Sequence, residues 1–292
     1  MAEFLGLPRL PLDDWIQKFV DWFVLNYRWF FQLVRSPIEW TLDNLEAFLQ
    51  WIPPVVVIAV LAVVAWRRDT LVFALFTGFS FVVIGVVGLW GEAMTTLAII
   101  FTALAFALVV GVPLGVLAAR SDRAWSLIRP VLDVMQTTPS FVYLVPVVML
   151  FGVGTVPGVI ATIIFSLPPL IRLTNLGLRQ VPESVVEAGH AFGATEWQML
   201  RGIRLPLALP SIMAGVNQTL LLAMVMSSIT AMIGAKGLGL TVLRGIGRLD
   251  VGLAAIGGLS LVLLAIIFDR ITQSFGRISR QDIFSRILGR WF

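Results

Sequence analysis

Long apolar stretches alternate with short polar segments over most of this 292-residue chain. A membrane-spanning helix needs about 20 mainly apolar residues, fewer or more with tilt and flanking anchors. About seven stretches meet that standard. We therefore predict an all-α integral membrane protein whose spans cover approximately residues 52–66, 70–89, 93–119, 128–152, 155–172, 209–233 and 250–268.

The first 51 residues form a separate extracytoplasmic or interfacial segment in this interpretation. Apolar and aromatic residues recur at helical spacing over 12–34, beside Lys18, Asp21 and Arg28. This pattern predicts an amphipathic helix lying in the outer membrane interface. An eighth span is the alternative, but three charges near its middle make it costly.

The basic residues predict the orientation of the chain. With seven alternating spans, about two thirds of the 21 Lys and Arg residues fall on one side, whereas most N-terminal acidic residues fall on the other. By the positive-inside rule, the loop 173–208 and the C-terminus are cytoplasmic and the N-terminus is outside. The basic tail 271–292 interleaves Arg with apolar residues, which favours either contact with anionic lipid or a solvated tail.

The segment 182–206 is the long polar interruption in the second half of the chain. Ser184–Glu187 and Thr195–Gln198 each match the capping box that begins a helix. Gly193 lies between them, where a left-handed residue ends the first helix, and we expect Pro206 to end the second. This helix–turn–helix elbow is predicted to expose an apolar face for a partner, formed by Val185, Val186, Phe192, Trp197, Met199 and Leu200.

The elbow resembles the EAA motif of ABC-importer permeases, whose consensus is EAA-x3-G-x9-I-x-LP. The matching positions are Glu187, Ala188, Gly189, Gly193, Ile203, Leu205 and Pro206, with Gly189 where Ala is usual. The resemblance implies a type I, MetI-like permease arrangement in which the elbow couples to a separate ATPase subunit. It also implies an extracytoplasmic solute-binding protein, a homodimer of this chain, and a location in the bacterial inner membrane. Residues 89–270 would form the permease domain, and 52–88 peripheral spans.

Further stretches between residues 85 and 275 are similar to permeases of ProU-type glycine betaine/proline betaine importers and their choline-importing relatives. They include "QTTPSFVYLVPVVMLFGVGTVPGV" and "GLGLTVLRGIGRLDVGLA". The resemblance implies import of quaternary ammonium compatible solutes. The alternative is an ion-coupled secondary transporter of onium compounds, although no internal repeat is evident and Asp133 is the one candidate coupling carboxylate.

Composition narrows the chemistry further. The chain is 58% hydrophobic and 13% charged, with a mean hydropathy of +0.93, no cysteine and a single histidine, His190. Thiolate and multi-histidine metal sites are thereby excluded. The sequence has no G-x4-G-K-[ST] loop, so ATP and its Mg²⁺ are expected on the partner ATPase, with no cofactor or catalytic residue in this chain. The net charge of +4 is a topology signal rather than a nucleic-acid footprint.

Polar residues at membrane depth are candidates for the translocation path. One group lies within the predicted fourth span, 128–152: Gln136, Thr137, Thr138, Ser140 and Tyr143. The other lies on the sixth span: Asn217, Gln218, Thr219, Met224 and Met226. These groups either line the path or serve helix packing and hydrogen bonding. Asp133 is expected to pair with Arg129, four residues earlier. Lys236, Arg244 and Arg248 lie in the predicted outer loop after the sixth span, either as a solvated loop or as a docking rim for the binding protein.

Overall fold

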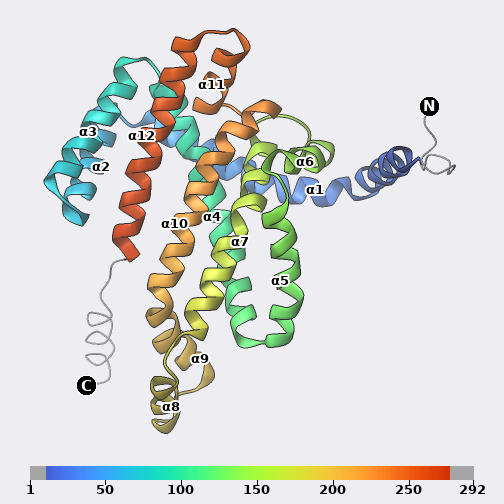
Figure 1. Ribbon diagram of the computed structural model, residues 1–292, viewed down its shortest axis with the longest axis vertical. Coiled ribbons are helices and arrows are strands. Elements are labelled where there is room, and N and C mark those ends of the chain that lie inside the picture. Colours follow the sequence, from blue (N-terminus) through green and yellow to red (C-terminus); the bar gives the residue numbers. More distant parts are fainter. Residues whose placement is uncertain (1–10, 277–292) are drawn as a thin grey trace, which may run out of the picture.

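The computed structural model describes residues 11–276, and these form helices joined by short turns. The α-helices are α1 (Leu12–Trp51), α2 (Pro54–Arg68), α3 (Leu71–Val86), α4 (Trp90–Arg120), α5 (Asp122–Thr137), α6 (Leu144–Phe151), α7 (Thr155–Arg179), α8 (Glu183–Ala191), α9 (Glu196–Met199), α10 (Leu205–Ile229), α11 (Leu238–Gly247) and α12 (Val251–Gly276). Three shorter helical elements lie between them, η1 (Ser140–Tyr143), η2 (Leu200–Arg204) and η3 (Thr230–Ile233). The elements are labelled in Figure 1.

Within the described residues, four helical segments are long and apolar enough to cross a membrane: α4, α7, the continuous stretch Glu196–Ile233, and α12. Up to six spans result if each of two bent helix pairs crosses once, fewer than the approximately seven predicted. The sequence interval 128–152 shows why. Its two helical parts meet at 110°, because Pro139 lacks an amide and forces Thr138 into an extended conformation. Helix α3 is apolar but, with 16 residues, shorter than these four segments.

The N-terminal helix α1 is longer than the predicted 12–34, since it continues to Trp51 with a kink at Tyr27. It runs crosswise to the long helices in Figure 1, and its second part makes an angle of 100° with α2. Glu46 anchors it to α4 by accepting a 2.6 Å hydrogen bond from the Thr95 hydroxyl. Much of its aromatic surface is exposed, including Trp15, Trp29 and Trp40. Such a crosswise, aromatic-rich helix has the geometry expected of an interfacial element.

The central layer consists of α4, α7 and α10, and glycines allow these helices to approach closely. On α4, Gly111 faces Leu170 and Gly115 faces Thr174, both on α7. On the other side of α7, Gly177 lies against Ser211 of α10. Small residues at such crossings let helices pack closely in a membrane, where apolar burial against lipid alone gives little driving force for association. Helix α7 thus forms the spine of the bundle and continues to Arg179, beyond the predicted end of its span at 172.

Helices α2, α4 and α7 carry arginines in their last turns, and these helices run toward the end of the bundle that carries α8 and α9 (Figure 1). The turn between α2 and α3 joins the late part of α12 through an ion pair, with Arg270 Nε 2.6 Å from Asp69 Oδ2. Arg68 also stacks over the Phe275 ring, 4.2 Å from its centroid. Helix α12 is described as far as Gly276, so residues 271–276 of the predicted tail are helical, and the basic segment 277–292 lies outside the described residues.

Candidate coupling elbow and translocation residues

Two backbone hydrogen bonds close the turn of the elbow, and Gly193 adopts the backbone conformation that they require. Its backbone has a left-handed φ of +77°. The Gly193 amide donates to His190 O at 2.9 Å, and the Ala194 amide donates to Gly189 O at 3.0 Å. This pair of bonds is the Schellman motif, which ends a helix and favours glycine at the left-handed position. The predicted helix end at Gly193 is therefore confirmed.

The second helix of the elbow begins with the predicted capping box at Thr195. Its hydroxyl oxygen accepts from the Gln198 amide, while Gln198 Oε1 accepts from the Thr195 amide at 2.8 Å. The box predicted at Ser184 is wrong. Helix α8 begins after Pro182 with no side-chain cap, which leaves Ser184 inside the first turn. Proline supplies this helix start with a preset φ, so that Ser184 is not needed as a cap.

The inner face of the elbow is a small apolar contact between α8 and the following helix. A Cβ added at Gly189 would lie 2.5 Å from Met199 Cε and 3.0 Å from Ile203 Cδ1. Met199 is fully buried, and Leu200 is also buried, so the expectation that they are exposed is wrong. The residues Gly189, Met199 and Ile203 together hold α8 against the start of the next span. Glycine at the position where the family consensus has Ala therefore makes room for the methionine.

The outer face of the elbow carries two large exposed side chains, Phe192 and Trp197, with exposed fractions of 88% and 63%. They lie on either side of the Gly193 turn, near the exposed Glu187 and Ala188. Neither aromatic residue belongs to the EAA consensus. The sequence feature that indicates their exposure is their position close to the turn, where no neighbouring helix covers their side chains. Val185 and Val186 are half-buried.

Pro206 does not end the second helix, contrary to the prediction. The chain stays helical from Glu196 to Ile233, through a π-helical turn at Leu200–Arg204. Pro206 is the second residue of α10, so its missing amide falls within this continuous helix. The wider π turn lies just upstream, where the proline would otherwise interrupt the α-helical hydrogen bonds. The elbow is thus joined to α10 without a flexible loop, and short turns join it to α7.

The first candidate path group lies where α5 ends. The Thr138 hydroxyl donates to Val134 O at 2.7 Å, the Thr137 hydroxyl contacts Val134 O and Asp133 O, and the Tyr143 hydroxyl donates to Met135 O. These three hydroxyls therefore satisfy backbone carbonyls near the Pro139 break. Of the two predicted roles, this is hydrogen bonding within the helices rather than lining of the path. Gln136 is exposed and Ser140 is half-exposed.

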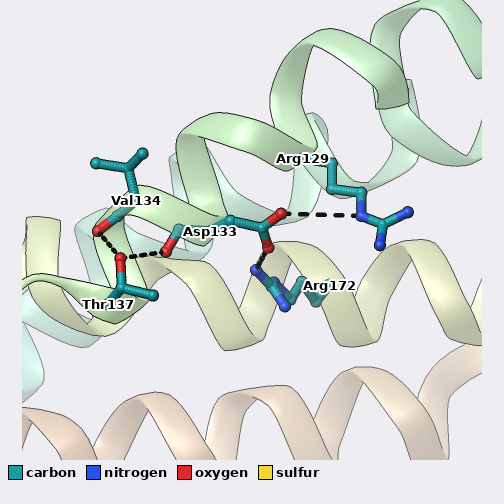
Figure 2. Close-up of polar contacts among 5 residues, drawn as sticks. All are labelled: Arg129, Asp133, Val134, Thr137 and Arg172. Carbon is teal, nitrogen blue, oxygen red and sulfur yellow. Dashed lines mark hydrogen bonds and ion pairs between the residues drawn. The ribbon is translucent and has the colours of Figure 1, made fainter.

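Asp133 links α5 to α7, as Figure 2 shows. Its Oδ2 lies 3.9 Å from Arg129 Nε, which confirms the expected pair, and its Oδ1 contacts Arg172 of α7. The sequence pattern did not indicate Arg172, because the partner is 39 positions away. Asp122 makes a second link between the same helices, 2.7 Å from Arg179. The two ion pairs hold α5 beside α7, although Leu132 is the one buried residue in this helix.

The second candidate group is divided between the faces of α10. Asn217 is buried and donates at 2.7 Å to Asp269 Oδ1 of α12, which also accepts from Gln273. Thr219, Met224 and Met226 are buried too, whereas the adjacent Gln218 is exposed. Asp269 is a carboxylate on α12, facing α10, that the sequence reasoning missed. It follows an apolar run directly, and this position is the signal that could have revealed it.

The expected outer loop after the sixth span is instead mostly the helix α11. Lys236 precedes this helix in a turn, with its amide 3.3 Å from Thr155 Oγ1, while Arg244 lies in its last turn and Arg248 at its C-cap. All three are exposed. They belong to the end of the molecule opposite the elbow (Figure 1).

The apolar helices packed around α7, with a helical elbow at one end, define an all-helical membrane-embedded protein. The chain belongs to the family described as binding-protein-dependent transport system inner membrane component, whose model matches residues 111–280. It is thus the permease subunit of an ABC transporter, and a separate subunit binds and hydrolyses ATP. The predicted family is confirmed.

The relatives and a solved structure agree with this membership. The chain is 53% identical over 283 residues to the glycine betaine/proline betaine transport system permease protein ProW of Escherichia coli, covering 97% of this chain and 79% of that protein. It is 41% identical to the glycine betaine transport system permease protein OpuAB of Bacillus subtilis, covering 92% and 95%. It also superimposes on a chain of the inward-facing MetNI methionine ABC transporter with a TM-score of 0.57 at 25% identity, covering 65% and 95%. The similarity to ProW includes the N-terminal segment, which the motifs between 85 and 275 did not cover.

Proposed function

We propose that this chain is the permease of an ATP-driven importer of quaternary ammonium compatible solutes, with glycine betaine, proline betaine or choline as substrates. The observation that carries the proposal is the 53% identity to a glycine betaine/proline betaine permease over nearly the whole chain. The names of three further relatives include glycine betaine, carnitine or trimethylamine N-oxide, which share a methylated onium group.

The elbow is the proposed coupling element. Phe192 and Trp197 would insert into a groove of the ATPase subunit, with Glu187 and Ala188 beside them. Large exposed aromatic residues are typical anchors of such interfaces. Because the elbow continues directly into α10 and is tied to α7 by short turns, its displacement by ATPase closure would move both helices. That movement biases the permease between inward-open and outward-open states.

In the proposed topology, the elbow and the C-terminus are cytoplasmic, and the α10–α11 and α11–α12 turns are outside. The arginines of the α2–α3 and α4–α5 turns, the elbow and late α12 share the elbow's end of the bundle, in keeping with the positive-inside rule. Two copies of the chain would form the transport path between them, as a homodimer. Helix α1 would lie in the outer interface, with α2 and α3 as short apolar helices at the periphery of the bundle.

Exposed polar side chains near the middle of the bundle are the proposed lining of the path. Gln136, Ser140 and Gln218 fit this role, since each retains a surface that a passing solute or a second copy can contact. The hydroxyls of Thr137, Thr138 and Tyr143, and the buried Asn217, Thr219, Met224 and Met226, would shape the helices behind that surface.

The test of the proposed function is reconstitution of the complex with its ATPase and binding protein in vesicles. We expect ATP-dependent uptake of glycine betaine that a proton or sodium gradient does not replace. Gly193→Val should abolish uptake, because a β-branched residue is strained at a φ of +77°. The binding protein should then no longer stimulate ATP hydrolysis by the complex. Gly202→Val is the matched control in the same elbow, where a new Cβ meets open space. Uptake driven by an ion gradient alone would refute the importer, and full activity of Gly193→Val would refute the coupling role.

A further inference from the structure

The turn between α11 and α12 contains a leucine in a conformation that favours glycine. Leu249 has a φ of +56° and is the one described non-glycine residue with positive φ. Its amide donates to Ile246 O at 3.1 Å, and the Asp250 amide donates to Gly245 O at 2.8 Å. These are the two hydrogen bonds of a Schellman motif, with Leu249 at the left-handed position.

The elbow provides a direct comparison within the same molecule. Gly193 occupies the corresponding position after α8, with the same two hydrogen bonds and a φ of +77°. A residue with a Cβ is disfavoured in this conformation, and glycine is not. The α11–α12 turn would therefore be more stable with glycine, yet the sequence places a large apolar side chain there.

The leucine side chain gains no packing within the chain that would offset this strain. It is 90% exposed, and its neighbours Ile246 and Val251 are 61% and 80% exposed. We name these three residues the outer apex. A local rule that is broken without an internal gain is typical of a functional surface.

The outer apex is also held rigidly. A Cβ at Gly245 would collide with the backbone of Ala254, so α11 and α12 are in close contact at the turn. The Asp250 carboxylate caps α12 by accepting from the Leu253 amide at 2.9 Å. The exposed Arg244 and Arg248 are close in sequence on either side of Ile246, so positive charge borders the apex while the acidic group is engaged in the cap.

We propose that the outer apex is the anchor for the extracytoplasmic solute-binding protein, with Leu249 inserted into an apolar socket rimmed by carboxylates. The inference rests on the proposed function and its topology, which place this turn outside. A partner protein fits better than lipid, because a fluid acyl phase solvates a leucine in any backbone conformation and requires no strained turn. A preformed apolar knob with flanking arginines suits a complementary acidic protein surface, in which a few anchors carry most of the binding free energy.

The test measures binding of the purified binding protein to the complete permease–ATPase complex in nanodiscs. Leu249→Gly should weaken binding about tenfold, as for a truncated interface anchor, and should raise the melting temperature by about 2–4 °C because the turn strain is removed. Leu249→Ala should weaken binding without that thermal gain. Val86→Ala is the matched control, since Val86 is an 83% exposed apolar residue at the end of α3. It should bind like the unsubstituted complex.

Charge and lipid contact are tested separately. Arg244→Glu with Arg248→Glu should slow association and reduce its dependence on salt, since these residues would steer an acidic partner. Unchanged binding in the Leu249 variants, with a functional unsubstituted complex, would overturn the inference. Strong quenching of Leu249→Trp fluorescence by brominated lipid in the docked complex would also overturn it. If no binding protein bound even the unsubstituted complex, the proposed importer function itself would fail.

Discussion

The close crossing of α4 and α7 at Gly115 determines how firmly the elbow is supported. A Cβ at this position would lie 2.5 Å from Thr174 Cβ, 2.7 Å from Thr174 Cγ2 and 3.0 Å from Ile171 O. The threonine is fully buried and β-branched, and the carbonyl is backbone, so none of these atoms is the flexible end of a side chain. Gly115→Ala can therefore be accommodated only by separating the two helices.

The expected size of the effect follows from two opposing contributions. Alanine is favoured over glycine in a helix by about 1 kcal/mol, whereas overpacking a tight interior site costs about 1–3 kcal/mol. Gly258→Ala of α12 isolates the first contribution, because that glycine is also within a helix but a new Cβ meets open space. The free energy of unfolding of Gly115→Ala should therefore be about 1–3 kcal/mol below that of Gly258→Ala.

The assay is denaturant unfolding of the two variants in the same detergent, followed by ATPase stimulation in the reconstituted complex. We expect Gly115→Ala to lower both stability and coupling, since α7 leads directly to the elbow. Gly258→Ala should raise stability by about 1 kcal/mol and preserve coupling. Equal unfolding free energies would refute the argument that backbone proximity at this crossing supports the elbow. A Gly115→Ala variant more stable than Gly258→Ala would refute the packing geometry itself.

Three further changes test the elbow and the membrane-depth polar residues. Thr195→Ala should remove the capping box, destabilise α9 by about 1 kcal/mol and accelerate amide hydrogen exchange at Gln198, whereas unchanged exchange would argue against the cap. Gly189→Ala, which restores the usual family residue, should retain uptake because the flexible end of Met199 can move aside, whereas Gly189→Val should reduce it; equal activity of the two would contradict close packing there. Asn217→Leu should lower the free energy of unfolding by about 1.5–3 kcal/mol through loss of its hydrogen bond to the Asp269 carboxylate. Gln218→Leu should alter betaine uptake without changing stability, and the reverse pattern would make Gln218 the structural residue and Asn217 the path residue.

Several features of the chain follow from local sequence alone. Apolar runs long enough to span the bilayer predict the regions of α4, α7, α10 and α12, since lipid requires backbone groups to be paired within the helix. The left-handed Gly193 and the Thr195 capping box are also determined locally, because their hydrogen bonds join residues at most five positions apart. The elbow's position in the chain, and the resemblance to the permease family, could be predicted for the same reason.

Other features depend on which residues the tertiary structure brings together. The burial of Met199 depends on how α8 folds back on the next helix, and Leu200 is buried in a cluster with residues of α4, α7 and α10. The pairing of Asp133 with Arg172 depends on how α5 lies beside α7. Asn217 meets Asp269 across 52 positions, so its role could not be assigned from α10 alone. The cost of the left-handed Leu249 is equally invisible in the sequence, because leucine alone does not predict φ. Hydropathy and hydrogen bonds between near neighbours determine where helices form and end, whereas the close contacts between helices determine which face of each helix remains available for a partner or a solute.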